Sequence, residues 1–199
     1  HQDLTGAEAF FHLRRETVPQ VLDSAQAAKF LRAGRNPAVV FTHHCLGVWH
    51  YVGMPDLEMK RAFYQTAACG ASNWLAVFAP ALERQGAPTI ATVRDSYGFL
   101  RQHEELYTGA VSAAQTALVH SQATSLSYLS PRAAARAQVH EQDLILSAAG
   151  AAATEVNALK RGCEQLCTDE YAGFFYCLTR NHVPFDVIRD QDLRLPVLR

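Results

Sequence analysis

The chain lacks the features that mark membrane proteins and nucleic-acid-binding proteins. Its 199 residues include 18 basic and 19 acidic side chains, so its formal net charge is −1. A nearly neutral chain has no net field to attract nucleic acid or an anionic membrane surface. No apolar run approaches the roughly 20 residues that a transmembrane helix needs, and no charged segment followed by an apolar one opens the chain. We therefore expect neither a nucleic-acid partner nor a membrane partner.

Cysteine is also scarce, and its spacing does not indicate a disulfide framework. The five cysteines are Cys45, Cys69, Cys163, Cys167 and Cys177. An odd number without such spacing favours reduced thiols and, slightly, a cytoplasmic location. If the chain is an internal fragment, the absence of a signal peptide says nothing about secretion, so the location stays unknown. Cys163 and Cys167 are one helical turn apart, but no nearby second pair completes a zinc site, so buried helix cysteines are favoured. We predict no metal site and no cofactor.

What the chain does have is an alternation of helical and strand patterns, in a composition that is 49% hydrophobic and 19% charged. Alternating elements of this kind predict an α/β fold with parallel strands. In chain order, the patterns predict helices over 7–33, 55–69, 88–109, 132–166 and a segment ending near 180, with strands over 38–42, 72–78, 115–120 and 185–188. Pro19 is expected to kink or restart the first helix. Residues 43–53 and 121–131 are predicted to be loops.

The segment from Gly173 to Leu193 predicts a helix end, a break at Pro184 and a short buried strand. We expect this strand and the one that ends at His120 to be parallel neighbours, with Phe174 and Leu178 of the helix packed on them. A helix followed by a single parallel strand needs further strands beside it. The chain stops a few residues later and begins at His1. We therefore interpret it as an internal fragment of a larger protein.

The sharpest chemical feature is a cluster of imidazoles and aromatic rings after the strand predicted over 38–42. His43, His44 and Cys45 are followed by Trp49, His50 and Tyr51. Such side chains at the carboxyl end of a strand suit three roles: packing of a loop, contact with a sugar, or coordination of a metal. A metal site lacks a convincing carboxylate, because Asp56 and Glu58 complement a helix dipole. We take His43, His44 and Trp49 as candidate substrate-binding residues.

A second aromatic candidate lies within the strand predicted over 72–78. Trp74 could form the floor of a sugar subsite, or alternation along the strand could place it in a core. It is the fourth candidate substrate-binding residue.

Three stretches together resemble a known arrangement. Residues 60–78 resemble the last helix and eighth strand of a glycoside hydrolase (β/α)8 barrel, with Ala-Cys-Gly-Ala before the strand, and residues 96–109 are similar to the closing helix of that barrel. Residues 117–124 and 181–188 resemble the first two strands of the class I glutamine-amidotransferase-like trimerisation domain that follows the barrel in trimeric β-galactosidases.

The resemblance implies the last βα units of a barrel over residues 1–110 and the start of a flavodoxin-like trimerisation domain over residues 111–199. It also implies a carbohydrate substrate, a homotrimeric whole protein and hydrolysis of O-glycosidic bonds. The sequence departs from the family at residues 42–44, where Thr42, His43 and His44 stand in place of the expected glutamate of the seventh strand. None of them can replace a carboxylate in a two-carboxylate mechanism, so the catalytic residues are unknown and we expect the fragment to be inactive.

Two other functions stay open. The absent glutamate favours a noncatalytic sugar-binding or oligomerisation protein that keeps the fold. The histidine cluster leaves a metal-dependent hydrolase as a third reading.

Overall fold

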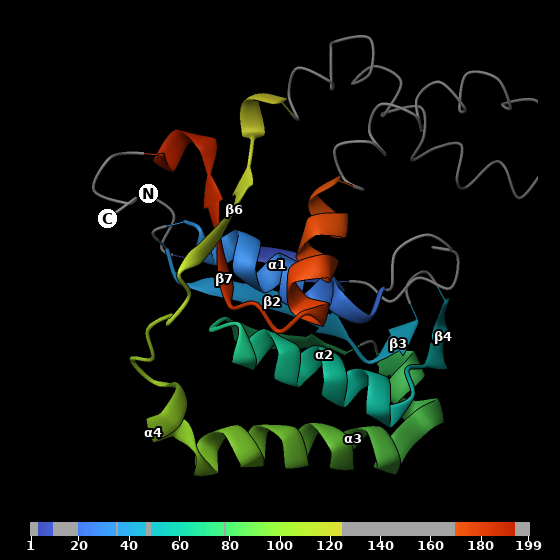
Figure 1. Cartoon of the computed structure of the whole chain (residues 1–199). Helices are drawn as coiled ribbons and strands as arrows, with labels where there is room; N and C mark the ends of the chain where they lie inside the picture. The colour runs from blue at the N-terminus through green and yellow to red at the C-terminus, as the bar shows by residue number, and fades with distance from the viewer. Residues whose placement is uncertain are drawn as a thin grey trace, which may run out of the picture. The chain divides into compact units, whose positions relative to one another are not determined.

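The computed structural model describes residues 4–9, 20–34, 36–46, 49–77, 79–124 and 170–193. Within these residues the chain is a mixed α/β protein with short parallel sheets, as its sequence predicts (Figure 1). It divides into two compact units, residues 1–117 with 182–187 and residues 118–181 with 188–199. None of the helices in the described part of the chain is long and apolar enough to cross a lipid bilayer.

The first unit is built on a parallel sheet of three strands in the order β1–β2–β5, with a separate antiparallel ribbon of β3 and β4. Its elements in chain order are β1 (Thr5–Ala9), the 3-10 turn η1 (Gln20–Leu22), α1 (Asp23–Arg32), β2 (Ala38–His43), β3 (Cys45–Leu46), β4 (Trp49–Gly53), α2 (Asp56–Ala68), β5 (Ser72–Ala76), α3 (Ala79–Gln102) and α4 (Glu104–Tyr107). Helix α1 packs against β1, β2 and α2, and α2 packs against β2, β5 and α3.

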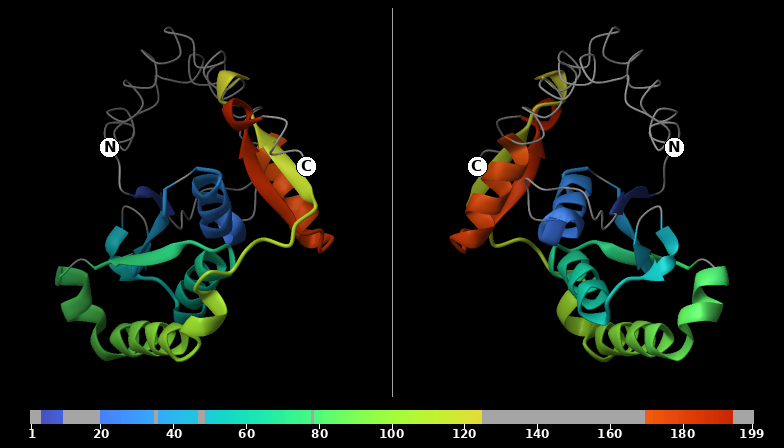
Figure 2. Two further views of the ribbon diagram at one scale, coloured as in Figure 1. Left: turned by 90° about the vertical axis from the view of Figure 1, so that its left-hand side faces the viewer. Right: turned by 90° about the vertical axis from the view of Figure 1, so that its right-hand side faces the viewer.

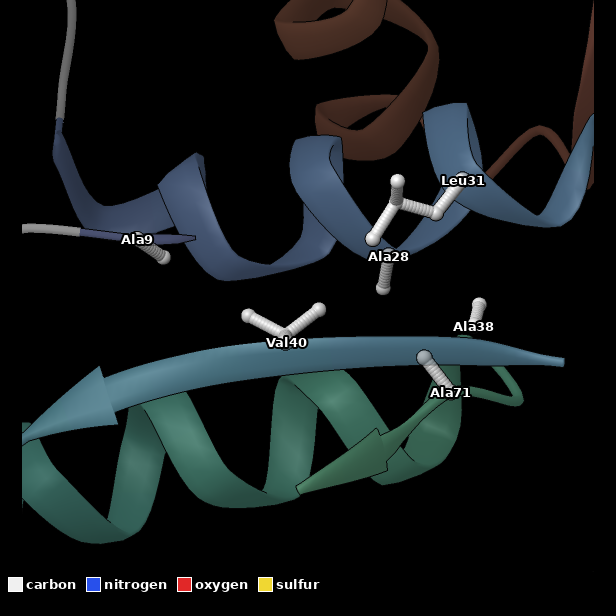
Figure 3. Close-up of a cluster of buried hydrophobic side chains, with 6 residues drawn as sticks. All are labelled: Ala9, Ala28, Leu31, Ala38, Val40 and Ala71. Atoms are coloured by element: carbon white, nitrogen blue, oxygen red, sulfur yellow. The ribbon is translucent and has the colours of Figure 1, made fainter. Parts of the chain in front are cut away.

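The core between the sheet and α1 consists of small residues and a few large ones. Val40 is fully buried, and Figure 3 shows its side chain and that of Ala38 pointing toward Ala28 and Leu31 of α1. Ala9 and Ala71 complete the cluster. Small side chains let the helix approach the sheet closely, so this contact fixes α1 on one face of the strands.

The interpretation of residues 7–33 as one long helix is wrong at its start. Residues from Thr5 to Ala9 form β1, which pairs in parallel with β2 over the register Thr5↔Ala38 to Ala9↔Thr42. In the part of this stretch that the structure describes, the α-helix is Asp23–Arg32. The residues shared with the predicted helix, Ala7, Glu8 and Ala9, are good helix formers, so pairing with β2 outweighs local preference in this short segment. The kink expected at Pro19 lies outside the described residues.

The ends of α2 follow the sequence signals. Pro55 precedes the first helical residue and Asp56 and Glu58 stand in the first turn, where acidic groups are favoured. Gly70 has a φ of 75°, and its N–H donates to the Ala67 carbonyl oxygen at 2.9 Å. This left-handed residue after the helix is a common helix stop. The prediction of a helix over 55–69 that stops at Gly70 is therefore confirmed.

Two other element boundaries differ from the expectation. Helix α3 begins at Ala79, nine residues before the proline that was expected to open it, and Pro88 lies inside the helix. Pro80 occupies the first turn instead, where a missing N–H has little effect. Residues 43–53 are not a simple loop, because β3 and β4 form an antiparallel ribbon there. The register of the ribbon is irregular, and short irregular strands carry a weak sequence pattern.

The strands predicted over 38–42 and 72–78 are neighbours and parallel, as expected. Their burial is less complete than the apolar runs indicate. Val40 is fully buried, whereas Val39 and Leu75 are half-buried and Val77 lies beyond β5 with 46% of its surface exposed. Val39 alternates toward the face that α1 and α2 leave uncovered, so part of its surface stays exposed. Leu75 pairs with Thr42 and therefore lies on the helix-covered face with Val40, where it packs against Met54 and Met59 without being fully enclosed.

A second parallel sheet consists of β6 (Thr116–His120) and β7 (Phe185–Arg189), followed by the 3-10 turn η3 (Asp190–Asp192). Both strands run in the same direction in Figure 1, and the views in Figure 2 show the helix over residues 170–180 (orange) lying along them. The prediction that these distant segments are neighbouring strands is confirmed. The Ala-rich segment expected to be helical over 132–166 lies outside the described residues.

The buried face of the helix over 170–180 differs from the predicted one. Phe174 was expected to pack on the sheet, but 57% of its surface is exposed, whereas Phe175 is 1% exposed and Ala172 is 5% exposed. One residue corresponds to 100° around a helix, so a small error in phase exchanges the buried and exposed faces. Leu178, the other expected contact, is half-buried.

Candidate functional site

The two faces of the three-stranded sheet have different character. Ala38 and Val40 point toward α1, so the alternate residues of β2, Phe41 and His43, project from the opposite face. Glu8 of β1 and Trp74 of β5 are the direct partners of Phe41 in the parallel register, and paired residues share a face. We call the face that carries Glu8, Phe41, His43 and Trp74 the aromatic face.

Phe41 and Trp74 form an aromatic pair on this face. Their ring centroids are 5.0 Å apart and their planes are inclined by 33°. The Trp74 side chain is held by its strand and by the Phe41 ring, yet 55% of the residue's surface is exposed. The pair therefore presents a fixed apolar surface to solvent, the kind of surface on which the C–H face of a sugar or another flat ligand can lie.

A carboxylate and an imidazole lie beside one another on the same face, toward the carboxyl ends of the strands. Oε1 of Glu8 is 3.8 Å from Nε2 of His43, and the interaction is a full ion pair only when the imidazole is protonated. The His43 side chain is 4% exposed, whereas that of Glu8 is 57% exposed. Glu8 can therefore reach a ligand from solvent while its position is biased by the fixed histidine.

His44 is turned into the protein interior. Its Nδ1 atom lies 3.1 Å from the carbonyl oxygen of Ala76, and its own carbonyl oxygen accepts a 2.9 Å hydrogen bond from the Met54 N–H. The residue is 0% exposed, so these contacts join the end of β2 to the end of β5 and to the segment after β4. The predicted contact of His44 with a sugar therefore requires this turn to open.

Cys45, the third member of the predicted cluster, is also fully buried. Burial raises the pKa of the Cys45 thiol, because the charged thiolate is poorly solvated there. A thiol with a raised pKa is a poor nucleophile and a poor metal ligand at neutral pH. Cys45, in strand β3 of the ribbon, therefore behaves as a small buried apolar residue.

The structure brings two of the four sequence-predicted residues, His43 and Trp74, onto one face. Trp49 lies on β4, where it pairs with Leu46 in the ribbon, and its side chain is not among those that the structure describes. The predicted sugar contacts of all four residues stay predictions. Among the described residues, no group of three or more histidine, cysteine, aspartate or glutamate side chains could hold a metal ion.

Sequence reasoning missed Glu8 and Phe41. Glu8 was assigned to a long helix, which hid its place beside the strand that ends at His43. A signal was present, because Gly6 and Glu8 alternate with Ala7 and Ala9, and the burial of β1 alternates in the same way. Phe41 was read only as part of a buried strand. No family model, curated protein or solved structure matches the chain, so the interpretation of the aromatic face depends on its own residues.

Proposed function

We propose that this chain is part of a carbohydrate-active, glycosidase-like protein and that the aromatic face binds a sugar. Support comes from the resemblance of residues 60–78 and 96–109 to the end of a glycosidase barrel. It comes also from the sheet, in which successive parallel strands are joined through α1 and α2 packed on one face. In a (β/α)8 barrel the helices cover the outer face of the strands, and ligands bind at the carboxyl ends. The aromatic face would be the inner face of such a barrel. Glu8, Phe41 and Trp74 are each within two residues of the carboxyl end of their strand, so they would lie near the end where ligands bind.

The observation that carries the proposal is the exposed Trp74–Phe41 pair on the same face as the Glu8–His43 pair. A sugar ring has an apolar face of C–H groups and a rim of hydroxyls. An aromatic pair offers surface for the first, and a partly exposed carboxylate accepts hydrogen bonds from the second. Apolar surface with a few convergent polar groups is the usual composition of a small-molecule site.

Binding without hydrolysis is the form of the proposal that the described residues favour. A glycosidase of the usual kind needs two carboxyl groups on either side of the scissile bond. Of the four residues that define the aromatic face, only Glu8 is a carboxylic acid. We therefore propose that Glu8 orients the sugar and that hydrolysis of O-glycosidic bonds, with a β-galactosidase-like specificity, belongs to the whole protein only if further residues supply a second carboxylate.

The proposed role of residues 111–199 is oligomerisation. It depends on the resemblance of residues 117–124 and 181–188 to a trimerisation domain, and the pairing of β6 with β7 agrees with the first two strands of that domain. The whole protein would be a homotrimer. Sedimentation equilibrium of a protein that contains the complete second domain tests this, and a monomer at micromolar concentration would contradict it.

The binding proposal is tested by titrating the protein with methyl β-galactoside while the indole N–H signals of Trp49 and Trp74 are followed by NMR. A Trp74→Phe variant assigns the two signals. We expect the Trp74 signal to shift with sugar concentration, and Trp74→Ala to weaken binding about tenfold, as the loss of an aromatic contact does. Tyr107→Ala is the matched control, because Tyr107 is a 40% exposed aromatic residue on α4.

Tyr107→Ala should bind the sugar as the wild type does. A Trp74 signal that stays unchanged at high sugar concentration would contradict sugar binding on this face. Equal loss of affinity in Trp74→Ala and Tyr107→Ala would attribute the effect to general destabilisation, and would also contradict the proposal.

A further inference from the structure

The position of the Phe41 ring depends on Gly6, which has no side chain. Gly6 lies on β1, in a strand where glycine is unfavourable because it has no side chain to pack and loses much backbone freedom. Among the described residues, the glycines with a positive φ are Gly70 and Gly109, so the backbone of Gly6 does not require glycine. A glycine inside a strand then indicates that another group approaches the backbone closely.

That group is the Phe41 ring. A Cβ atom placed on Gly6 would lie 2.4 Å from Cε2 of Phe41, 3.2 Å from Cζ and 3.4 Å from Cδ2. A contact of 2.4 Å is far inside van der Waals distance, so any other residue at position 6 would displace the ring. On its other side the ring meets Trp74, with centroids 5.0 Å apart. Phe41 is therefore held between the bare backbone of β1 and the Trp74 indole.

We propose that Gly6 is a positioning residue for the sugar site: its missing side chain lets the Phe41 ring lie across β1, and this placement sets where Trp74 stands. The inference depends on the proposed function for its ligand, a sugar, but the mechanical coupling of positions 6, 41 and 74 stands independently of that ligand. A methyl group at position 6 would push the Phe41 ring toward Trp74 or away from the sheet. Either movement would disturb the surface on which the sugar lies.

The test is a Gly6→Ala variant, combined with Phe41→Leu in a double-mutant cycle. Leucine lacks the Cε2 and Cζ atoms that approach Gly6 most closely, so alanine should fit beside it. We expect Gly6→Ala alone to shift the Trp74 indole N–H signal and to weaken binding of methyl β-galactoside about tenfold, the equivalent of one lost aromatic contact. In the Phe41→Leu background the same substitution should change neither quantity.

Gly98→Ala is the matched control, because a Cβ atom at Gly98 on α3 would meet no atom within 4 Å. It should leave the Trp74 signal and sugar affinity unchanged. An unmoved Trp74 signal in Gly6→Ala, or an equal effect of Gly6→Ala with and without Phe41→Leu, would overturn the inference. Because the indole signal is read without sugar, failure of the wild type to bind sugar would contradict the proposed function and leave the positioning test intact.

Discussion

The Oδ2 atom of Asp190 accepts a 3.0 Å hydrogen bond from the hydroxyl of Ser121, so the residue that follows β7 is fastened to the residue that follows β6. The same oxygen accepts a 2.9 Å bond from the Ala123 N–H, and Oδ1 accepts a 2.8 Å bond from the Gln191 N–H. One carboxylate thus satisfies donors from both turns at the carboxyl ends of the parallel pair. Backbone N–H groups that could otherwise hold an anion there are already bonded within the protein.

The Asp190 contacts predict a pH-dependent stability. Hydrogen bonds to the carboxylate, first among them the one from the Ala123 N–H, lower the pKa of Asp190 below its ordinary value. A depressed folded-state pKa means that the group contributes stability above the pKa it has when unfolded, and that this contribution is lost as the pH falls through the folded-state pKa. Asp190→Asn should therefore lower stability at pH 7, with the difference shrinking below the ordinary aspartate pKa of about 3.9.

Urea denaturation at a series of pH values measures this difference. Asp95→Asn is the control of equal charge change, because Asp95 is 61% exposed and lies beside the exposed Arg94 on α3, where an ion pair contributes little. A gap between wild type and Asp190→Asn that stays constant down to the lowest pH would show that the charged carboxylate is not what fastens the two turns.

A pair of glycine substitutions should have opposite effects on stability. Gly70 has a φ of 75°, and an alanine Cβ there would lie 3.3 Å from the Arg32 guanidinium carbon, so Gly70→Ala should cost about 1–2 kcal/mol. Gly98 lies inside α3 with open space around it, so Gly98→Ala should stabilise by about 0.5–1 kcal/mol. Thermal and urea unfolding measure both. A stabilising Gly70→Ala would contradict the assigned helix stop.

Phe174 and Phe175 test which face of the helix over residues 170–180 is buried. Phe175 is 1% exposed, so Phe175→Ala should lower the free energy of unfolding by about 3–5 kcal/mol. Phe174 is 57% exposed, so Phe174→Ala should change it by no more than about 0.5 kcal/mol. The two variants remove the same atoms, which makes each the control of the other. Equal losses would mean that both rings are buried and that the assigned helix face is wrong.

Local signals predicted the elements whose ends are set by single residues. Helix α2 was predicted nearly to its observed bounds, because Pro55 and Gly70 act through their own backbone preferences. The parallel pairing of β2 with β5 followed from two apolar runs joined by one helix. Such signals need no knowledge of the rest of the chain.

Features that depend on tertiary pairing were not predictable in the same way. Strand β1 is five residues long, and its state is decided by pairing with β2. The error there hid Glu8, and with it the carboxylate that lies near His43. Alternation indicated that Trp74 faces one side of a sheet, but only the packing of α1 and α2 decides which side is left open. His43 and His44 are adjacent in sequence and both are buried, but His43 lies beside Glu8 whereas His44 contacts the Ala76 carbonyl oxygen, a difference that follows from the turn at the end of β2.

The last prediction concerns the role of Glu8. On the proposed binding surface its carboxylate accepts a hydrogen bond from a sugar hydroxyl, and a hydrogen bond to a charged group contributes roughly 1.5–3 kcal/mol. Glu8→Gln keeps the size of the side chain but removes its charge, so the affinity for methyl β-galactoside should fall by about ten- to a hundredfold while the Trp74 signal still responds to saturating sugar. Glu105→Gln, an exposed carboxylate on α4, is the control and should bind as the wild type does.

Comparison of the wild type with Glu8→Gln also separates a role in binding from a role in catalysis. We expect neither wild type nor Glu8→Gln to hydrolyse a chromogenic β-galactoside, because Glu8 is the only carboxylic acid among the four residues that define the aromatic face. Loss of a general acid or base lowers a rate by about 10²–10⁴. If the wild type hydrolysed the substrate and Glu8→Gln lost that activity by such a factor with unchanged affinity, Glu8 would be a catalytic residue and the noncatalytic form of the proposal would be wrong. Calorimetric titration and a discontinuous absorbance assay of the three proteins distinguish these outcomes.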